Sequence, residues 1–186
     1  MALGALSIFV YVGCEVTIGS FMTNYLMQPR TLGMAAQDAG RLVSFYWGGA
    51  MVGRFIGSFV LQRISPSYVL VACAVVAAIL ATTSSMTVGP VAAYSLIAVG
   101  LFNSIMFPTI FSLALDGLGP DTEQGSGILC MAIVGGAVVP FIHGSLADHV
   151  GLHMAFIAPA LCYVYIVYYG LKGSQHGQRA QTAPAA

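Results

Sequence analysis

The stretch from Val69 to Thr83, VLVACAVVAAILATT, contains no charged side chain. The apolar run around it extends over residues 67–87, which is about the length that an α-helix needs to cross a bilayer. The rest of the chain has the same character, because 58% of its 186 residues are hydrophobic and only 6% are charged. A soluble domain carries about 25% charged residues. The sequence therefore predicts a membrane protein.

Apolar runs long enough to span a membrane occur at residues 2–27, 38–62, 67–87, 90–115, 124–146 and 152–171. The first run lacks the basic start and the small-residue cleavage site of a signal peptide, so we interpret it as a true span. Residues 1–172 are thus expected to form one six-helix transmembrane bundle. The polar residues 173–186 are expected to form a disordered cytoplasmic tail.

A shift of 87 residues aligns the sequence with itself and brings every predicted helix onto another helix. Each copy, residues 2–87 and residues 90–172, holds three helices, so the second copy must enter the membrane from the opposite side. The predicted fold class is an all-α membrane protein of two inverted three-helix repeats, as in one half of a major facilitator transporter. The glycines that coincide are Gly13 with Gly100, Gly40 with Gly127, Gly48-Gly49 with Gly135-Gly136, and Gly57 with Gly144.

The helices of each repeat differ in composition, which predicts different roles. The third and sixth are apolar nearly all round, as expected of lipid-facing outer helices. The second and fifth are rich in glycine, which allows close approach of helix backbones, either as static packing or in a moving interface. Pro108 and Pro140 predict kinks in the fourth and fifth helices. The first and fourth helices are expected to line a polar cavity with Glu15, Thr17, Ser20, Asn24, Asn103, Ser104, Thr109 and Ser112.

Four segments carry a family resemblance: YVGCEVTIGSFMTNYL from Tyr11, GRFIGSFVLQRISP from Gly53, FPTIFSLALDGLG from Phe107 and GGAVVPFIHGSLAD from Gly135. Together they resemble the fucose permease and glucose/galactose transporter family of the major facilitator superfamily. The resemblance covers helices seven to twelve of that twelve-helix fold, its carboxy-terminal half. It implies proton- or cation-coupled uptake of a hexose or deoxyhexose by alternating access across a bacterial inner membrane.

The amino-terminal six helices of that fold are absent from this sequence. The resemblance implies that the better-known proton-carrying and sugar-binding carboxylates belong to that half, and nothing here replaces them. The chain is interpreted as a fragment, a truncated product or a half that pairs with another half, and we favour the first two. The alternative function is a six-helix membrane assembly or regulatory partner without transport activity of its own.

Glu15 is the most unusual residue of the first helix. A charge at a helix centre costs roughly 2.5–3.5 kcal/mol on insertion, which about six apolar neighbours offset. Its presence has two explanations: a protonated carboxyl bonded to another helix, or a group that binds sugar hydroxyls or carries the coupling proton. On a helical wheel Glu15 shares a face with Tyr11, and Ser20 and Asn24 share the opposite face. Either face is a candidate for the cavity, the second with Asn24 as the solute-binding residue.

The predicted sugar-binding residues are Tyr11, Glu15, Ser20, Asn24, Trp47, Asn103 and Phe107. Trp47 is considered for stacking on a sugar ring, with an interfacial anchor as the alternative. Gly53 and Gly57 share a helix face that a neighbour can approach, while Arg54 and Arg63 reach toward the cytoplasmic surface. The resemblance implies that these four residues form a cytoplasmic gate. The alternative is snorkelling that follows from topology alone.

Basic residues predict the orientation in the membrane. If the helices alternate in direction, four of the six basic residues fall on the side of the termini and two on the other side. This places both termini in the cytoplasm. Three histidines, His143, His149 and His153, are interpreted as interfacial side chains in contact with water, with a proton relay as the alternative. The two basic groups are Arg54, Arg63, Lys172 and Arg179 on one side and Arg30 and Arg41 on the other.

Several functional classes are not indicated by the sequence. The four cysteines show no ligand-like spacing, so neither a metal site nor a disulfide framework is predicted. No HExxH, GxSxG, P-loop or paired-aspartate motif occurs, so no enzyme activity and no cofactor are predicted. The expected partners are a sugar substrate, a coupling proton or cation, the lipid bilayer and an amino-terminal six-helix half. No nucleic acid is expected.

Overall fold

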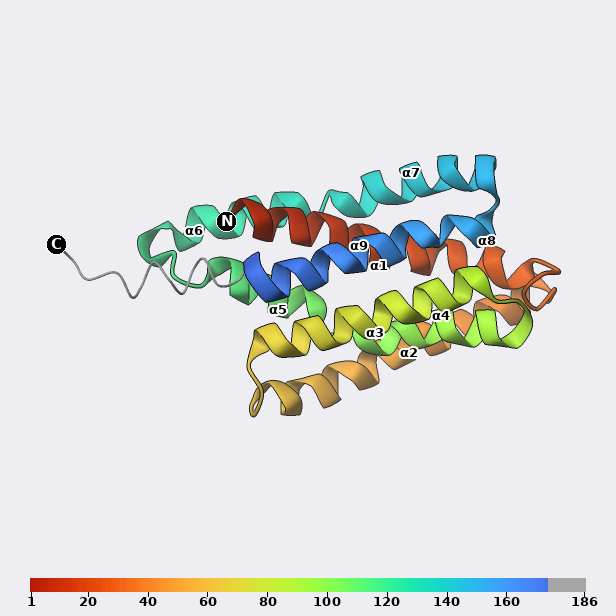
Figure 1. Ribbon diagram of the computed structural model, residues 1–186, viewed down its shortest axis with the longest axis horizontal. Helices are drawn as coiled ribbons and strands as arrows, with labels where there is room; N and C mark the ends of the chain where they lie inside the picture. The colour runs from red at the N-terminus through yellow and green to blue at the C-terminus, as the bar shows by residue number, and fades with distance from the viewer. Residues whose placement is uncertain (174–186) are drawn as a thin grey trace.

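The computed structural model describes residues 1–173, which form a bundle of roughly aligned helices (Figure 1). These residues contain no β-strand. The first three spans are continuous helices: α1 (Ala2–Met27), α2 (Ala36–Leu61) and α3 (Pro66–Met86). The last three are interrupted, giving α4 (Gly89–Asn103) and α5 (Met106–Leu115), α6 (Thr122–Ala132) and α7 (Gly135–Val150), and α8 (Leu152–Ala155) and α9 (Ile157–Tyr168). The short helices η1 (Gly119–Asp121) and η2 (Tyr169–Gly173) precede α6 and follow α9.

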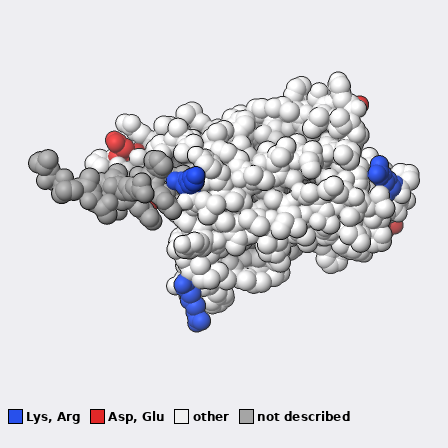
Figure 2. All heavy atoms as spheres, in the orientation of Figure 1, with Lys and Arg blue, Asp and Glu red and all other residues white. Residues whose placement is uncertain are grey.

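The all-α fold and the six predicted spans are confirmed. Five helical spans of the described chain are long and apolar enough to cross a membrane. The sixth, α2, is less apolar but has 26 residues, a length of about 39 Å. Charged side chains on the face shown in Figure 2 gather at the two ends of the bundle and leave its middle free of them. The chain is thus a multi-pass membrane protein. The predicted tail lies outside the described residues apart from Gly173.

Every interrupted span contains an internal proline after its break. Proline has no N–H to donate to the carbonyl four residues earlier, and its ring crowds that turn. For Pro108 this carbonyl belongs to Ser104, between α4 and α5, and for Pro159 it belongs to Ala155, the last residue of α8. Pro140 lies inside α7, shortly after the break that separates it from α6. The predicted disturbances of the fourth and fifth helices are confirmed, and the sixth is broken as well.

The helix arrangement has the symmetry of an inverted repeat. α1 and its counterpart α4–α5 run in opposite directions along the bundle (Figure 1). α1 packs on α7 and α2 packs on α4, which is the same contact with the repeats exchanged. A Cβ atom at Gly13 would clash with Val139 of α7, and one at the equivalent Gly100 would clash with the backbone of Tyr46 in α2. The coincident glycines therefore mark equivalent close contacts.

Buried and exposed apolar side chains occur on the same helices. α3 packs along α9, and both contribute fully buried side chains to the core. Their other faces are exposed, for example at Ile79 of α3 and Leu161 of α9. The glycine-rich helices α2 and α7 leave large aromatic side chains exposed. Phe45, Phe55 and Phe59 of α2 and Phe141 of α7 are examples, with exposed fractions from 65% to 81%.

Candidate solute-binding site

One arc of the α1 surface remains open between two neighbouring helices. On one side Gly19 faces α2, where the Trp47 ring would lie 2.8 Å from a Cβ atom added at this glycine. On the other side Gly13 faces α7. Between these two contacts Val16 is half-buried and Ser20 is exposed. The open arc therefore includes Ser20 of one predicted face and stops short of the Tyr11 face, because the positions of α2 and α7 decide what is covered.

Glu15 borders the open arc on the side of α2. Its side chain is half-buried, and Arg54 of α2 is the cation whose charge acts on it. The Trp47 ring of α2 lies against Gly19, one helical turn after Glu15, and the Trp47 side chain is 50% exposed. A carboxyl group, a guanidinium group and an aromatic ring thus gather where α1 meets α2. Such groups can donate and accept hydrogen bonds and cover an apolar surface.

Tyr11 and Asn103, by contrast, belong to a buried hydrogen-bond network. The Tyr11 hydroxyl donates to the backbone carbonyl of Asn103 at 2.7 Å. The Asn103 amide nitrogen donates to the Tyr46 hydroxyl at 2.9 Å, and the Tyr163 hydroxyl donates to the Asn103 amide oxygen at 2.8 Å. All four residues have an exposed fraction of 1% or less. The network joins α1, α2, α4 and α9, and a sugar-binding role of Tyr11 and Asn103 stays a prediction.

The break between α4 and α5 explains why polar groups gather there. The last carbonyls of a helix have no partner within the helix and need other donors. The Tyr11 hydroxyl donates to the Asn103 carbonyl. The Ser104 hydroxyl donates to the Leu101 carbonyl at 3.0 Å, and the Thr109 hydroxyl donates to the Ile105 carbonyl at 2.6 Å. Asn103, Ser104 and Thr109 are buried, so the expectation that they line a polar cavity does not hold in this structure.

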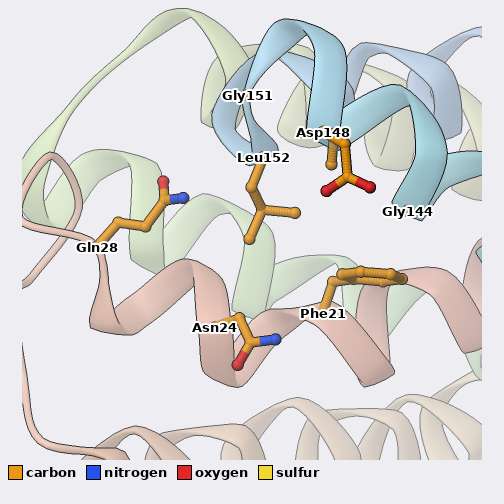
Figure 3. A pocket seen from close by; sticks show the side chains of 8 residues that line it. Phe21, Asn24, Gln28, Gly144, Asp148, Gly151 and Leu152 are labelled. Atoms are coloured by element: carbon orange, nitrogen blue, oxygen red, sulfur yellow. The ribbon is translucent and has the colours of Figure 1, made fainter.

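The remaining predicted sugar-binding residues lie apart. Phe107 is half-buried behind Tyr11, with ring centroids 6.5 Å apart. Ser20 lies on the open arc and is exposed. Asn24 is exposed one turn further along α1 and lines a groove next to the end of α7 (Figure 3). The structure thus brings Glu15 and Trp47 together but not the whole predicted set.

The four predicted gating residues separate into two kinds. Gly53 and Gly57 are buried, and a Cβ atom there would clash with Leu101 of α4 and with Ile105 of the α4–α5 break respectively. Arg54 and Arg63 are exposed. Arg63 follows Leu61, the last residue of α2. Arg54 lies seven residues before Leu61, about 10 Å along the helix axis. Arg54 therefore belongs spatially with Glu15, and the gating role of the four residues stays a prediction.

Two histidines expected to touch water are buried instead. His143 and His153 have exposed fractions of 2% and 5%. The His143 ring packs against Phe21 and Phe156 with centroid distances of 4.9 Å and 5.1 Å, and the His153 ring stacks on Tyr25 at 5.5 Å. These ring contacts come from helices far apart in sequence, so no local pattern could reveal them. His149 is exposed, as expected.

Comparison with known proteins gives close relatives in sequence. A glucose/galactose transporter of Brucella abortus (strain 2308) is 57% identical over 175 residues, which are 94% of this chain and 42% of that protein. An L-fucose-proton symporter of Escherichia coli (strain K12) is 35% identical over 172 residues, 90% of this chain and 38% of that protein. The chain spans about two fifths of the length of these curated relatives. No family model matches the chain.

Solved structures agree with the sequence relatives. The crystal structure of FucP, a major facilitator superfamily transporter, in the outward conformation matches with a TM-score of 0.88 and 32% identity, covering 91% of this chain and 41% of that chain. A peptide transporter matches with a TM-score of 0.78 at 18% identity, which shows the fold alone. The fold and the sequence relatives thus define a major facilitator protein. Within that superfamily, the chain belongs to the family of the glucose/galactose transporters and L-fucose symporters.

Proposed function

We propose that this chain is the carboxy-terminal half of a secondary active transporter that takes up a hexose or deoxyhexose together with a proton or cation. The observation that supports it is the gathering of Glu15, Arg54 and Trp47 beside the open arc of α1, in a chain whose relatives are named for glucose, galactose and L-fucose. An amino-terminal six-helix half supplies the opposite wall of the cavity. The protein resides in a bacterial inner membrane with both termini in the cytoplasm.

The groups at this site suit a neutral polyol. The Glu15 carboxyl accepts hydrogen bonds from sugar hydroxyls, and the Arg54 guanidinium donates to them. The exposed part of the Trp47 ring covers the apolar face of the sugar. Carboxylate and guanidinium also offset each other's charge, which lowers the cost of placing both inside the membrane.

The same pair offers a route from proton binding to movement. A proton on Glu15 removes the negative charge that attracts Arg54. The contact between α1 and α2 then weakens, while Gly53 and Gly57 keep α2 close to α4 without interlocking side chains. Proton binding would thus favour displacement of α2 against α1, as alternating access between two bundles requires. Arg63, at the cytoplasmic end of α2, completes the proposed gate.

A chimera tests the proposal. The chain is joined to the part of the Brucella abortus relative that it does not match, and uptake of radiolabelled D-glucose, D-galactose and L-fucose is measured in cells without their own carriers. We expect uptake of at least one sugar by the chimera. The chain alone, in vesicles, should not transport, because one bundle supplies one wall of the site.

Variants of the chimera test the site. Glu15→Gln should lower uptake or proton-coupled accumulation by about ten- to a hundredfold, the order of effect of losing a charged hydrogen bond to the substrate. Glu123→Gln, at an exposed carboxyl of α6, is the matched control and should retain uptake. Membrane level is measured for each variant. A chimera present at a normal level without uptake contradicts the proposed function, and full activity of Glu15→Gln leaves that residue a structural role only.

A further inference from the structure

A second polar groove lies at the end of the bundle opposite to the N-terminus (Figure 1). Its volume is about 530 Å³, and it opens between the last turns of α1, the last turns of α7 and the start of α8. Phe21 is six residues beyond Glu15 on α1, about 9 Å along the helix axis. The groove is therefore separate from the site beside α2. The lining residues that matter here are Phe21, Asn24, Gln28, Gly144, Asp148 and Leu152.

The floor of the groove is an aromatic ring that is held in place. The Phe21 ring lies against the buried His143 ring, which in turn packs on Phe156. Gly144 allows this placement, since a Cβ atom there would come within 3.3 Å of the Phe21 Cζ atom. Neither ring nitrogen of His143 has a hydrogen-bond partner among residues 1–173. The ring contacts therefore account for the placement of Phe21 without any polar bond.

The polar groups of the groove have free hydrogen-bonding capacity. Figure 3 shows the Asp148 carboxylate and the Leu152 side chain extending toward α1, with the Phe21 ring beneath Asp148 and the Gln28 side chain at the rim. Asn24 also lines the groove, from α1. Within the described part of the chain, no hydrogen bond or ion pair occupies the side chains of Asp148, Asn24 or Gln28. A carboxylate, two amides and an aromatic face are thus available to a ligand.

This combination fits a sugar better than an ion. A carboxylate accepts from neighbouring hydroxyls, amides donate and accept, and an aromatic ring packs on an apolar face of a sugar. The volume lies in the range of small-ligand sites, about 300–1,000 Å³. A metal cation instead requires a close shell of six or so oxygen atoms. One carboxylate in a groove of this width does not provide such a shell.

We infer that this groove is an outer binding subsite for a neutral hexose or deoxyhexose, held by Asp148 and Phe21 before it reaches the site at Glu15. The identity of the ligand as a sugar rests on the proposed function. Binding at the groove, however, needs only residues of this chain, whereas transport needs both halves. The two proposals can therefore fail independently.

The test measures sugar binding to the 186-residue chain in lipid nanodiscs, by equilibrium dialysis with radiolabelled D-galactose, D-glucose or L-fucose. We expect saturable binding of at least one of them. Asp148→Asn and Phe21→Leu should each weaken it by about tenfold, as expected for the loss of a charge-assisted hydrogen bond or of a stacked ring. The matched controls Asp38→Asn and Phe45→Leu change an exposed carboxylate and an exposed ring of α2 and should bind as the unmodified chain does.

Circular dichroism and gel filtration establish that each variant is folded, and Gly144→Leu, which fills the groove from α7, gives an independent variant. Absence of saturable binding to the folded chain overturns the inference. So does binding that Asp148→Asn, Phe21→Leu and Gly144→Leu all leave unchanged, or a sodium or proton dependence that Asp148→Asn alters without any effect on sugar affinity. Uptake by the chimera is a separate readout, so transport without groove binding refutes the subsite and leaves the proposed function standing.

Discussion

The two repeats of this protein share a helix pattern but differ in how their helices are built. In the first repeat α1, α2 and α3 are unbroken over 26, 26 and 21 residues. In the second repeat each equivalent span is divided into two helices. The first repeat has no proline inside a span, whereas the second has Pro140 inside α7 and has Pro108 and Pro159 in the first turn after a break. Internal prolines thus turn equivalent spans into different backbones.

The difference also decides where polar groups lie. The α4–α5 break exposes backbone carbonyls to the interior of the bundle, and buried carbonyls need donors. The Ser104 and Thr109 hydroxyls donate to two such carbonyls, whereas the Asn103 side chain bonds to the Tyr46 and Tyr163 hydroxyls. The unbroken α1 has no carbonyls left free inside the bundle by a break. Its Glu15 is half-buried, and its Ser20 and Asn24 are exposed. An unbroken helix is free to present polar groups to a solute, while a broken one uses them to support itself.

The inversion that underlies this comparison has an all-or-none test. Arg30 follows α1 and Asp116 follows α5, so the two positions end equivalent spans. Single cysteines at these positions, in a background without the four native cysteines, should react from opposite sides of the membrane. Position 30 should label from outside and position 116 only after the cells are opened. The reverse pattern would invert the orientation, and labelling of both from one side would exclude the inverted repeat.

Substitution of the two asparagines of the first and fourth spans should change the free energy of unfolding by very different amounts. Asn103→Leu leaves the Tyr46 and Tyr163 hydroxyls without their partner, and we expect a loss of about 2–4 kcal/mol. Asn24→Leu changes an exposed residue and should change the free energy of unfolding by about 0.5 kcal/mol or less. Unfolding of the purified chain in mixed micelles provides the measurement. Equal losses would show that the buried network does not support the broken span.

Close helix contacts at glycine should contribute equally to the free energy of unfolding in both repeats. A Cβ atom at Gly53 would clash with the Leu101 backbone, and one at Gly135 would clash with the backbone of Phe9. Alanine at either position should destabilise the chain by about 1–3 kcal/mol through overpacking. Gly48→Ala is the control, since nothing lies within 4 Å of its added Cβ atom, and higher helix propensity should make it neutral or stabilising by up to about 1 kcal/mol. A penalty in one repeat only would break the symmetry of these contacts.

The smallest expected effect concerns the bond that links the two repeats at the break. Tyr11→Phe removes the donor to the Asn103 carbonyl and should cost about 1 kcal/mol. In a Pro108→Ala background the restored N–H can donate to the Ser104 carbonyl and join α4 to α5, so that the Phe107 N–H can reach the Asn103 carbonyl. The same change should then cost less. A double-mutant cycle on the free energy of unfolding measures this coupling. Strict additivity of the two changes would mean that Tyr11 does not compensate for the break.

The sequence by itself determined the class of protein, the six spans, the repeat and two of the three helix breaks. These properties depend on hydropathy summed along a segment, on the spacing of equivalent glycines and on the missing N–H of proline, all of which are local. The wheel of α1 also grouped its residues into faces. It could not tell which face stays open, because that depends on where α2 and α7 lie.

Only the tertiary structure decided which polar residues meet. Tyr46 and Tyr163 join Asn103 across 57 and 60 residues of sequence, and Arg54 approaches Glu15 from another helix. His143 and His153 are buried for the same reason, since their aromatic partners come from other helices. Such contacts depend on the rotation and close approach of packed helices, which periodicity within one helix does not specify.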